Sequence, residues 1–132
     1  MYPLDNTEKP QKILLIEDDI PFRETLTELL TFEGYEVFEA ENGYLGLQLS
    51  KKQLPNIILC SRMFSDVSCL NILQELRKEE LTKQIPFIFL SSMPFGPEHK
   101  KMANDESVTV LIKPFFIMDL KNSISDCLSL AK

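Results

Sequence analysis

The sequence has few of the features that mark membrane, nucleic-acid-binding or zinc proteins. No apolar run approaches the ~20 residues that a membrane-spanning helix needs. Residues 1–12 hold no apolar stretch of signal-peptide length, so we expect a cytoplasmic protein without membrane contact. Acidic residues outnumber basic ones by 20 to 14, the net charge is −6, and no basic stripe is present, which argues against nucleic-acid binding by this chain.

Histidine and cysteine are also scarce, which argues against a zinc site. The single histidine, His99, lies in a weakly helical polar stretch, and we expect it to be a solvated surface residue. Cys60, Cys69 and Cys127 are widely spaced and form no CxxC pair. We interpret them as unpaired thiols in a reducing compartment.

The length and composition are typical of one globular domain. The chain has 132 residues, of which 44% are hydrophobic and 26% charged, enough to bury a substantial core. Its first eleven residues are polar and contain Pro3 and Pro10, so we predict a flexible N-terminal arm over residues 1–11. The domain itself is expected to span residues 12–132.

Short apolar runs alternate with longer segments of helical periodicity along the chain. The first run is continuous, as expected for a parallel strand that is covered on both faces. The predicted strands are residues 13–16, 37–38, 57–60, 87–90 and 108–112. A helix is predicted after each strand, although residues 98–104 support one only weakly. The pattern predicts an α/β fold with five parallel strands and five helices on the two faces of the sheet.

The predicted helices show apolar positions at helical spacing. The first helix has Pro21 in its opening turn and ends at Gly34. The residues expected to face inward are Phe22, Leu26, Leu29 and Leu30 in the first helix, Leu70, Leu73 and Leu76 in the third, and Leu120, Ile124 and Leu128 in the last.

Acids, hydroxyls and a lysine follow the predicted strands. In parallel α/β sheets the carboxyl ends of the strands meet at one edge, where ligands bind. The residues that the pattern places there are Glu17-Asp18-Asp19, Ser61-Arg62-Met63, Ser91-Ser92 and Lys113-Pro114. We predict a functional site at this edge, with Asp19 acting as the cap of the following helix.

Several segments resemble the receiver domain of bacterial two-component response regulators (CheY-like), in the same order and spacing. They are ILLIEDD, FEGYEVFEAENG, PNIILCSRM, IPFIFLSS and LIKPF, and the resemblance runs from about Lys12 to Leu128. It implies a flavodoxin-like sheet with strand order 2-1-3-4-5 and a role in phosphorelay signal transduction rather than as an enzyme.

The resemblance also implies roles for individual residues. Glu17 and Asp18 match the acidic pair that holds a divalent metal, with the main-chain carbonyl of Met63 as a further ligand; magnesium suits such oxygen ligands. Ser91 and Lys113 match the hydroxyl and the ammonium that bind the phosphoryl group. The Lys113-Pro114 bond resembles one that is cis in the family.

Three departures from the family pattern affect its reaction. Ser61 stands where the family has the phosphoacceptor aspartate, and a serine hydroxyl is a poor nucleophile without an adjacent base. The loop after Ser61 lacks the proline and glycine of the family. Val110 replaces the aromatic residue whose rotation reports phosphorylation. No catalytic residue is therefore assigned, and any metal site is expected to be weak or vestigial, with no cofactor or weakly bound Mg²⁺.

We interpret the chain as an atypical, phosphorylation-independent interaction module of two-component signalling. Its expected partner is a histidine kinase or another signalling protein. A homodimer could form through the face of the fourth helix, fifth strand and fifth helix, where Phe95, Val110, Phe116 and Ile117 are candidate contacts. Two alternatives are a working receiver that uses Asp66 or another acid, and a pocket adapted to a small ligand.

Overall fold

A computed structural model describes residues 9–61, 66–92 and 96–130 of the chain, so most of the predicted arm lies outside the described residues. Five strands and five helices alternate along the sequence. The strands are β1 (Lys12–Ile16), β2 (Glu36–Ala40), β3 (Ile57–Ser61), β4 (Phe87–Ser91) and β5 (Val108–Ile112). The helices are α1 (Ile20–Phe32), α2 (Gly43–Gln53), α3 (Cys69–Lys78), α4 (Pro97–Ala103) and α5 (Ile117–Leu130).

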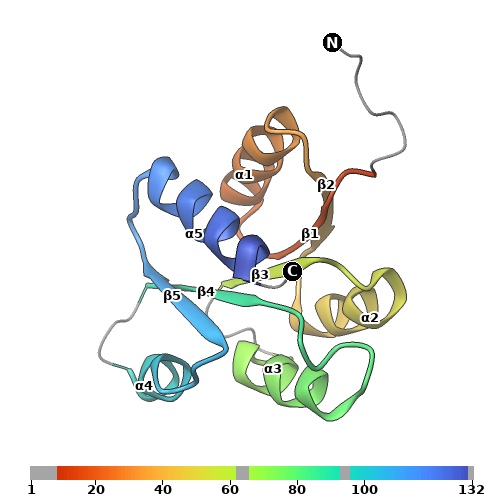
Figure 1. Cartoon of the computed structure of the whole chain (residues 1–132). Helices are drawn as coiled ribbons and strands as arrows, with labels where there is room; N and C mark the ends of the chain where they lie inside the picture. The colour runs from red at the N-terminus through yellow and green to blue at the C-terminus, as the bar shows by residue number, and fades with distance from the viewer. Residues whose placement is uncertain (1–8, 62–65, 93–95, 131–132) are drawn as a thin grey trace.

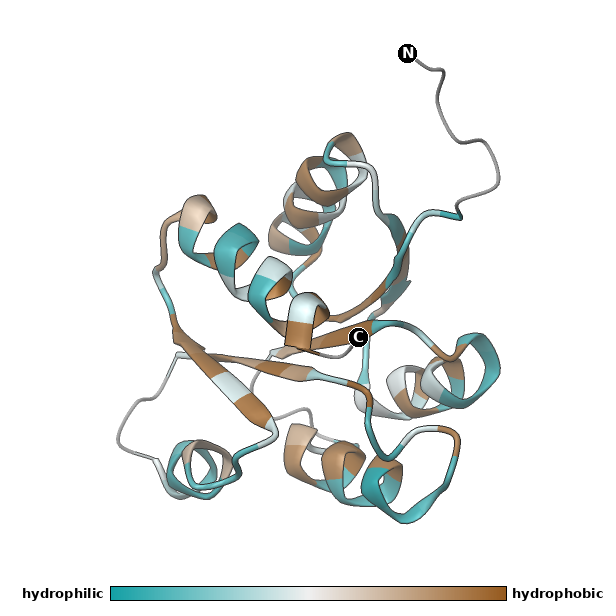
Figure 2. Ribbon diagram, viewed as in Figure 1, coloured by the Kyte–Doolittle hydropathy of each residue, from teal (hydrophilic) through white to brown (hydrophobic). Residues whose placement is uncertain are grey.

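All five strands pair in parallel in the order β2-β1-β3-β4-β5, which confirms the predicted sheet. Helices α1 and α5 cover one face, and α2, α3 and α4 cover the other (Figure 1). Strands β1, β3 and β4 are almost wholly buried, which explains why their sequences are continuous apolar runs. Figure 2 shows them as brown ribbon between helices that alternate brown and teal.

Two apolar clusters lie on opposite faces of the sheet. The cluster beneath α1 and α5 contains Leu26, Leu30, Leu120, Ile124 and Leu128, as predicted. Leu29 was predicted to face inward, but this prediction is wrong: its side chain is 40% exposed, because the stripe of α1 is narrower than the sequence suggested.

The second strand and the fourth helix differ from their predicted extents. Strand β2 spans five residues rather than two, and the sequence did not reveal its full length because its exposed positions carry Glu36 and Glu39. The weakly predicted segment near 98–104 is a regular helix, α4, which begins at Pro97 and is held to the core through buried Met102. No helix within residues 9–61, 66–92 and 96–130 is long and apolar enough to cross a membrane.

The structure pairs Cys60 and Cys69 in a disulfide, which corrects the expectation that all three cysteines are unpaired thiols. The bond joins β3 to the first residue of α3 across nine positions of sequence, and both residues are fully buried. Only Cys127 remains a free cysteine among the described residues. Sequence spacing could not identify this pair, because the two residues approach only after α3 folds back onto the sheet.

The first residue of α2 leaves no room for a side chain. A Cβ on Gly43 would overlap the main-chain carbonyl of Val67, which lies in the segment between β3 and α3. A Cβ on Gly46, one turn later, would instead meet the side chain of Ile16. Gly43 therefore allows the segment after β3 to lie directly against the start of α2.

We expect Gly43→Ala to destabilise the fold more than Gly46→Ala. The carbonyl of Val67 belongs to the main chain and cannot rotate away, so the first substitution should cost about 2–3 kcal/mol, the upper part of the range for overpacking. The Ile16 side chain can adjust, and alanine is the better helix former, which offsets part of the second cost. Urea denaturation measures both; equal losses would contradict this account of the Gly43–Val67 contact.

Candidate functional site

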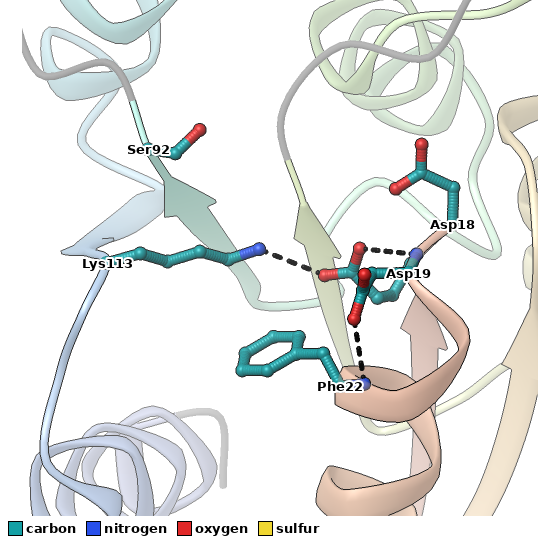
Figure 3. A pocket seen from close by; sticks show the side chains of 6 residues that line it. Asp18, Asp19, Phe22, Ser92 and Lys113 are labelled. Carbon is teal, nitrogen blue, oxygen red and sulfur yellow. Dashed lines mark hydrogen bonds and ion pairs between the residues drawn. The ribbon is translucent and has the colours of Figure 1, made fainter.

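The predicted edge of the sheet contains a pocket of about 510 Å³. It is lined by Glu17, Asp18, Asp19, Phe22, Ser92 and Lys113. These residues come from the segments that follow β1, β4 and β5, where the carboxyl ends of the strands meet. Figure 3 shows the lysine reaching across this edge toward the acidic residues.

Lys113 makes the central contacts of the pocket. Its Nζ donates to Glu17 Oε1 at 3.1 Å and to Ser61 Oγ at 2.8 Å, so the lysine pairs with the acid that directly follows β1. The ammonium also lies over the ring of Phe22, 4.4 Å from the centroid, in a cation–π contact. The three interactions connect β5 to β1, β3 and α1.

Glu17 is the buried acid of this network, with a relative exposure of 1%. Its second carboxylate oxygen, Oε2, accepts from the main-chain N–H of Asp19 at 3.0 Å. Both carboxylate oxygens are thus engaged by the protein itself. The main-chain carbonyl of Glu17 accepts from Arg23 Nη1 at 2.7 Å, which secures the residue from the α1 side.

The two aspartates after Glu17 differ from it in environment. Asp19 caps α1 as predicted, accepting from the N–H of Phe22 at 2.9 Å. Asp18 is exposed, and in Figure 3 its carboxylate points away from Lys113. The acidic pair therefore divides into one buried carboxylate bound to a lysine and one carboxylate open to solvent.

The donors at this edge fit a divalent metal poorly. Glu17 is bound to an ammonium, and Ser61 supplies a hydroxyl that already accepts from the same ammonium. The described residues contain no group of three or more His, Cys, Asp or Glu that could hold a metal ion. Met63, whose carbonyl was expected to be a ligand, lies outside the described residues. A metal here would compete with Lys113 for the Glu17 carboxylate.

Ser61 is fully buried as the last residue of β3. Its backbone pairs with Leu90 of β4, and its hydroxyl lies 2.8 Å from Lys113 Nζ. The described environment gives its Oγ a hydrogen-bond donor, Lys113, rather than a base. An ammonium that donates to the hydroxyl does not activate it for nucleophilic attack.

Ser91 ends β4 and is almost fully buried. The Nδ1 atom of His99 lies 3.0 Å from its Oγ, within hydrogen-bonding distance. His99 is only partly exposed, so the prediction of a solvated surface histidine is wrong. The reason is the docking of α4 against β5 and α3, which turns this position of a short polar helix toward the sheet.

Asp66 lies between β3 and α3 along the chain, and its side chain binds the start of α2. Its carboxylate accepts from the N–H groups of Gly43 at 3.2 Å and Tyr44 at 2.8 Å. Desolvation acts to raise the pKa of this carboxyl, but several main-chain N–H donors outweigh it and hold the pKa below its usual range. This stabilisation is complete above the ordinary pKa of an aspartate and is lost as the pH falls through the lowered value.

The other predicted positions are distributed as follows. Val110 is partly buried and packs against the core beneath α3 and α4, whereas Phe116 is 80% exposed and Ile117 37% exposed. Phe95 lies outside the described residues. The Lys113-Pro114 bond is cis, as predicted. Sequence reasoning missed Phe22 and Arg23 as neighbours of the site. The helical spacing marked Phe22 only as a packing residue, and the pattern gave no signal for Arg23.

Comparison with known proteins identifies relatives of the whole fold. The family described as the response regulator receiver domain matches residues 13–125. The phosphate regulon transcriptional regulatory protein PhoB of Pseudomonas aeruginosa is 32% identical over 105 residues, which cover 78% of this chain and 45% of that protein. Sporulation initiation phosphotransferase F of Bacillus subtilis is 26% identical over 121 residues, covering 91% of this chain and 95% of the relative.

Solved structures agree on the fold. A response regulator of Chloroflexus aurantiacus superposes with a TM-score of 0.80 at 29% identity, covering 92% of this chain and 99% of the other. The receiver domain of a sensor histidine kinase from Pseudomonas aeruginosa has a TM-score of 0.80 at 23% identity, covering 92% and 99%, and holds a magnesium ion in its active site cleft. The chain spans 33–48% of the length of the first five curated relatives that it matches.

We expect Lys113→Met to destabilise the protein by roughly 2–4 kcal/mol, because it leaves the buried Glu17 carboxylate without its cation. Glu17→Gln in the same chain removes that charge and should recover a large part of the loss. The double variant will therefore be less destabilised than the sum of the two single variants. Urea denaturation of all four proteins measures the coupling; additive losses would show that the pair contributes little.

Proposed function

The chain belongs to the response regulator receiver domain family of two-component signalling, and on this premise we propose that it acts as a phosphorylation-independent protein–protein interaction module. Members of this family are signalling modules rather than enzymes, and this holds for the present chain. The observation that carries the proposal is the contact of Lys113 with both Glu17 and Ser61. Within the pocket, the carboxylate of Glu17 balances the positive charge of Lys113, so no phosphoryl group is needed for this purpose.

The chemistry of position 61 supports the same proposal. Phosphoryl transfer to a receiver requires a carboxylate nucleophile at the end of β3, and Ser61 offers a hydroxyl that accepts from an ammonium. Asp66 does not take over this role, because its carboxylate is bound to the first N–H groups of α2. An acid that caps a helix would have to give up those bonds to reach the pocket.

We further propose that magnesium binds weakly, at millimolar concentration or above. Magnesium keeps most of its waters and prefers carboxylate oxygens that are free to coordinate. Asp18 is the one exposed carboxylate of the pair, while Glu17 is bound to Lys113. The magnesium ion seen in the related kinase receiver belongs to that protein.

The proposed partner is a histidine kinase or another signalling protein in the cytoplasm, or a second copy of this chain. Four apolar side chains between the end of β5 and the first turn of α5 form an exposed group, here called the β5–α5 patch. They are Ile112, Phe116, Ile117 and Met118, with exposures of 37–80%. An apolar group of this kind at the end of two neighbouring elements favours protein contact.

We expect the chain to gain no phosphoryl group when it is incubated with acetyl phosphate and magnesium. Ser61→Asp is the matched control, since it restores the carboxylate nucleophile at the same position and should show a phosphoryl adduct. Intact-mass measurement, followed by peptide mapping, reads out both proteins. A stable adduct on residues 61–66 of the unaltered chain would refute the proposal.

We expect Phe116→Ser to weaken homodimer formation by at least about tenfold, as loss of a central aromatic contact does. The residue is exposed, so the substitution should change the free energy of unfolding by less than about 0.5 kcal/mol. Phe32→Ser is the matched control, because Phe32 is 87% exposed at the end of α1 and lies outside the β5–α5 patch. Sedimentation equilibrium measures both; a monomeric unaltered chain, or equal effects of the two variants, would contradict this interface.

A further inference from the structure

The disulfide between Cys60 and Cys69 lies directly beside the pocket. Cys60 precedes Ser61 in β3, where its backbone pairs with Ile16 of β1 and Phe89 of β4. Cys69 is the first residue of α3. Their Cα atoms are 6.1 Å apart, a separation that a disulfide spans without moving the backbone.

The bond closes a short loop between Cys60 and Cys69, of which the structure describes Ser61 and residues 66–68. Three of these described residues make defined contacts. At one end Ser61 binds Lys113, and within the loop Asp66 caps α2. Ser68 caps α3 by accepting from the N–H of Asn71 at 3.1 Å. The disulfide therefore fixes the first turn of α3 to the end of β3 and holds the two ends of the loop together.

We propose that Cys60 and Cys69 form a reversible redox site that sets the position of residues 66–68, which bind the start of α2 and the start of α3. The oxidant is a low-molecular-weight disulfide. One cysteine thiolate attacks it, releasing one small thiol and forming a mixed disulfide; the second cysteine thiolate then attacks the protein sulfur and releases the other small thiol. Two protein thiols are oxidised, and one small disulfide is reduced to two thiols.

The expected compartment supports a regulatory bond rather than a permanent one. Disulfides of cytoplasmic proteins are usually transient, catalytic or redox-sensing. The third cysteine does not compete for the pair, because Cys127 packs on the opposite face of the sheet, with its sulfur 3.5 Å from Thr109 Oγ1. The redox site thus has one defined pairing, and it goes beyond the phosphorylation-independent interaction proposed above.

Burial determines how fast the site reacts. Both cysteines have no exposed surface, so a small thiol reaches them only when the start of α3 opens locally. Exchange should therefore be slow in buffer and faster in low concentrations of urea. A site of this kind responds to a sustained change in the thiol–disulfide balance.

The test begins with the thiol count. The full chain is equilibrated with oxidised glutathione or with dithiothreitol and quenched with acid to stop exchange. It is then unfolded in denaturant at neutral pH with excess maleimide, and its mass is measured. We expect one label after oxidation and three after reduction, with a Cys60–Cys69 peptide in the oxidised sample. Three labels after oxidation, even at urea concentrations that open α3, would overturn the proposal, as would a pair that includes Cys127.

Reversibility and its structural effect are measured on the same samples. Reduction should lower the melting temperature by about 5–10 °C. It should also shift the amide signals of Gly43 and Tyr44 in a ¹H–¹⁵N spectrum, because these groups bind Asp66. Resistance to dithiothreitol until the protein unfolds globally would show a permanent structural bond, and identical spectra in the two states would show that the loop does not respond.

Two variants keep the test specific. Cys127→Ser should retain the whole redox-dependent change in melting temperature. This variant should carry no maleimide label after oxidation and two labels after reduction. Cys69→Ala, which keeps the site apolar, should match the reduced protein in both oxidant and reductant. A redox-dependent change that persists in Cys69→Ala would assign the effect to another group.

Discussion

The ion pair between Lys113 and Glu17 holds together the edge of the sheet where the site lies. Glu17 is buried at the end of β1, and an unpaired carboxylate at that depth would be costly. Lys113, which follows β5, binds this carboxylate and also the hydroxyl of Ser61 in β3. One ammonium therefore connects three strands and, through Phe22, the first helix.

Serine at position 61 changes what this lysine does. In receivers that accept a phosphoryl group, an aspartate at this position supplies both the nucleophile and negative charge. Here the lysine binds a hydroxyl and a single buried carboxylate, while Ser91, another hydroxyl of the edge, lies within hydrogen-bonding distance of His99 on α4. Val110 packs into the core rather than presenting a rotating aromatic ring. The arrangement is consistent with a fixed pocket and a function in protein contact.

The described residues that lead into α3, 66–69, are held by contacts with α2 and with β3. Asp66 binds the start of α2, the absence of a side chain at Gly43 lets the segment approach, and the Cys60–Cys69 bond fixes the start of α3. These contacts use residues that have no role in phosphoryl chemistry. The redox control that we propose for this segment therefore acts through residues other than Ser61.

The sequence by itself determined the order of strands in the sheet and which residues lie at the edge that holds the site. Continuous apolar runs revealed the strands because β1, β3 and β4 are covered on both faces, and parallel topology required Glu17, Ser61 and Lys113 to meet. The tertiary structure decided which groups bind each other: the disulfide, the His99–Ser91 contact, the exposure of Leu29 and the cap made by Asp66. These depend on the rotation and docking of each helix, which periodicity locates only to within part of a turn.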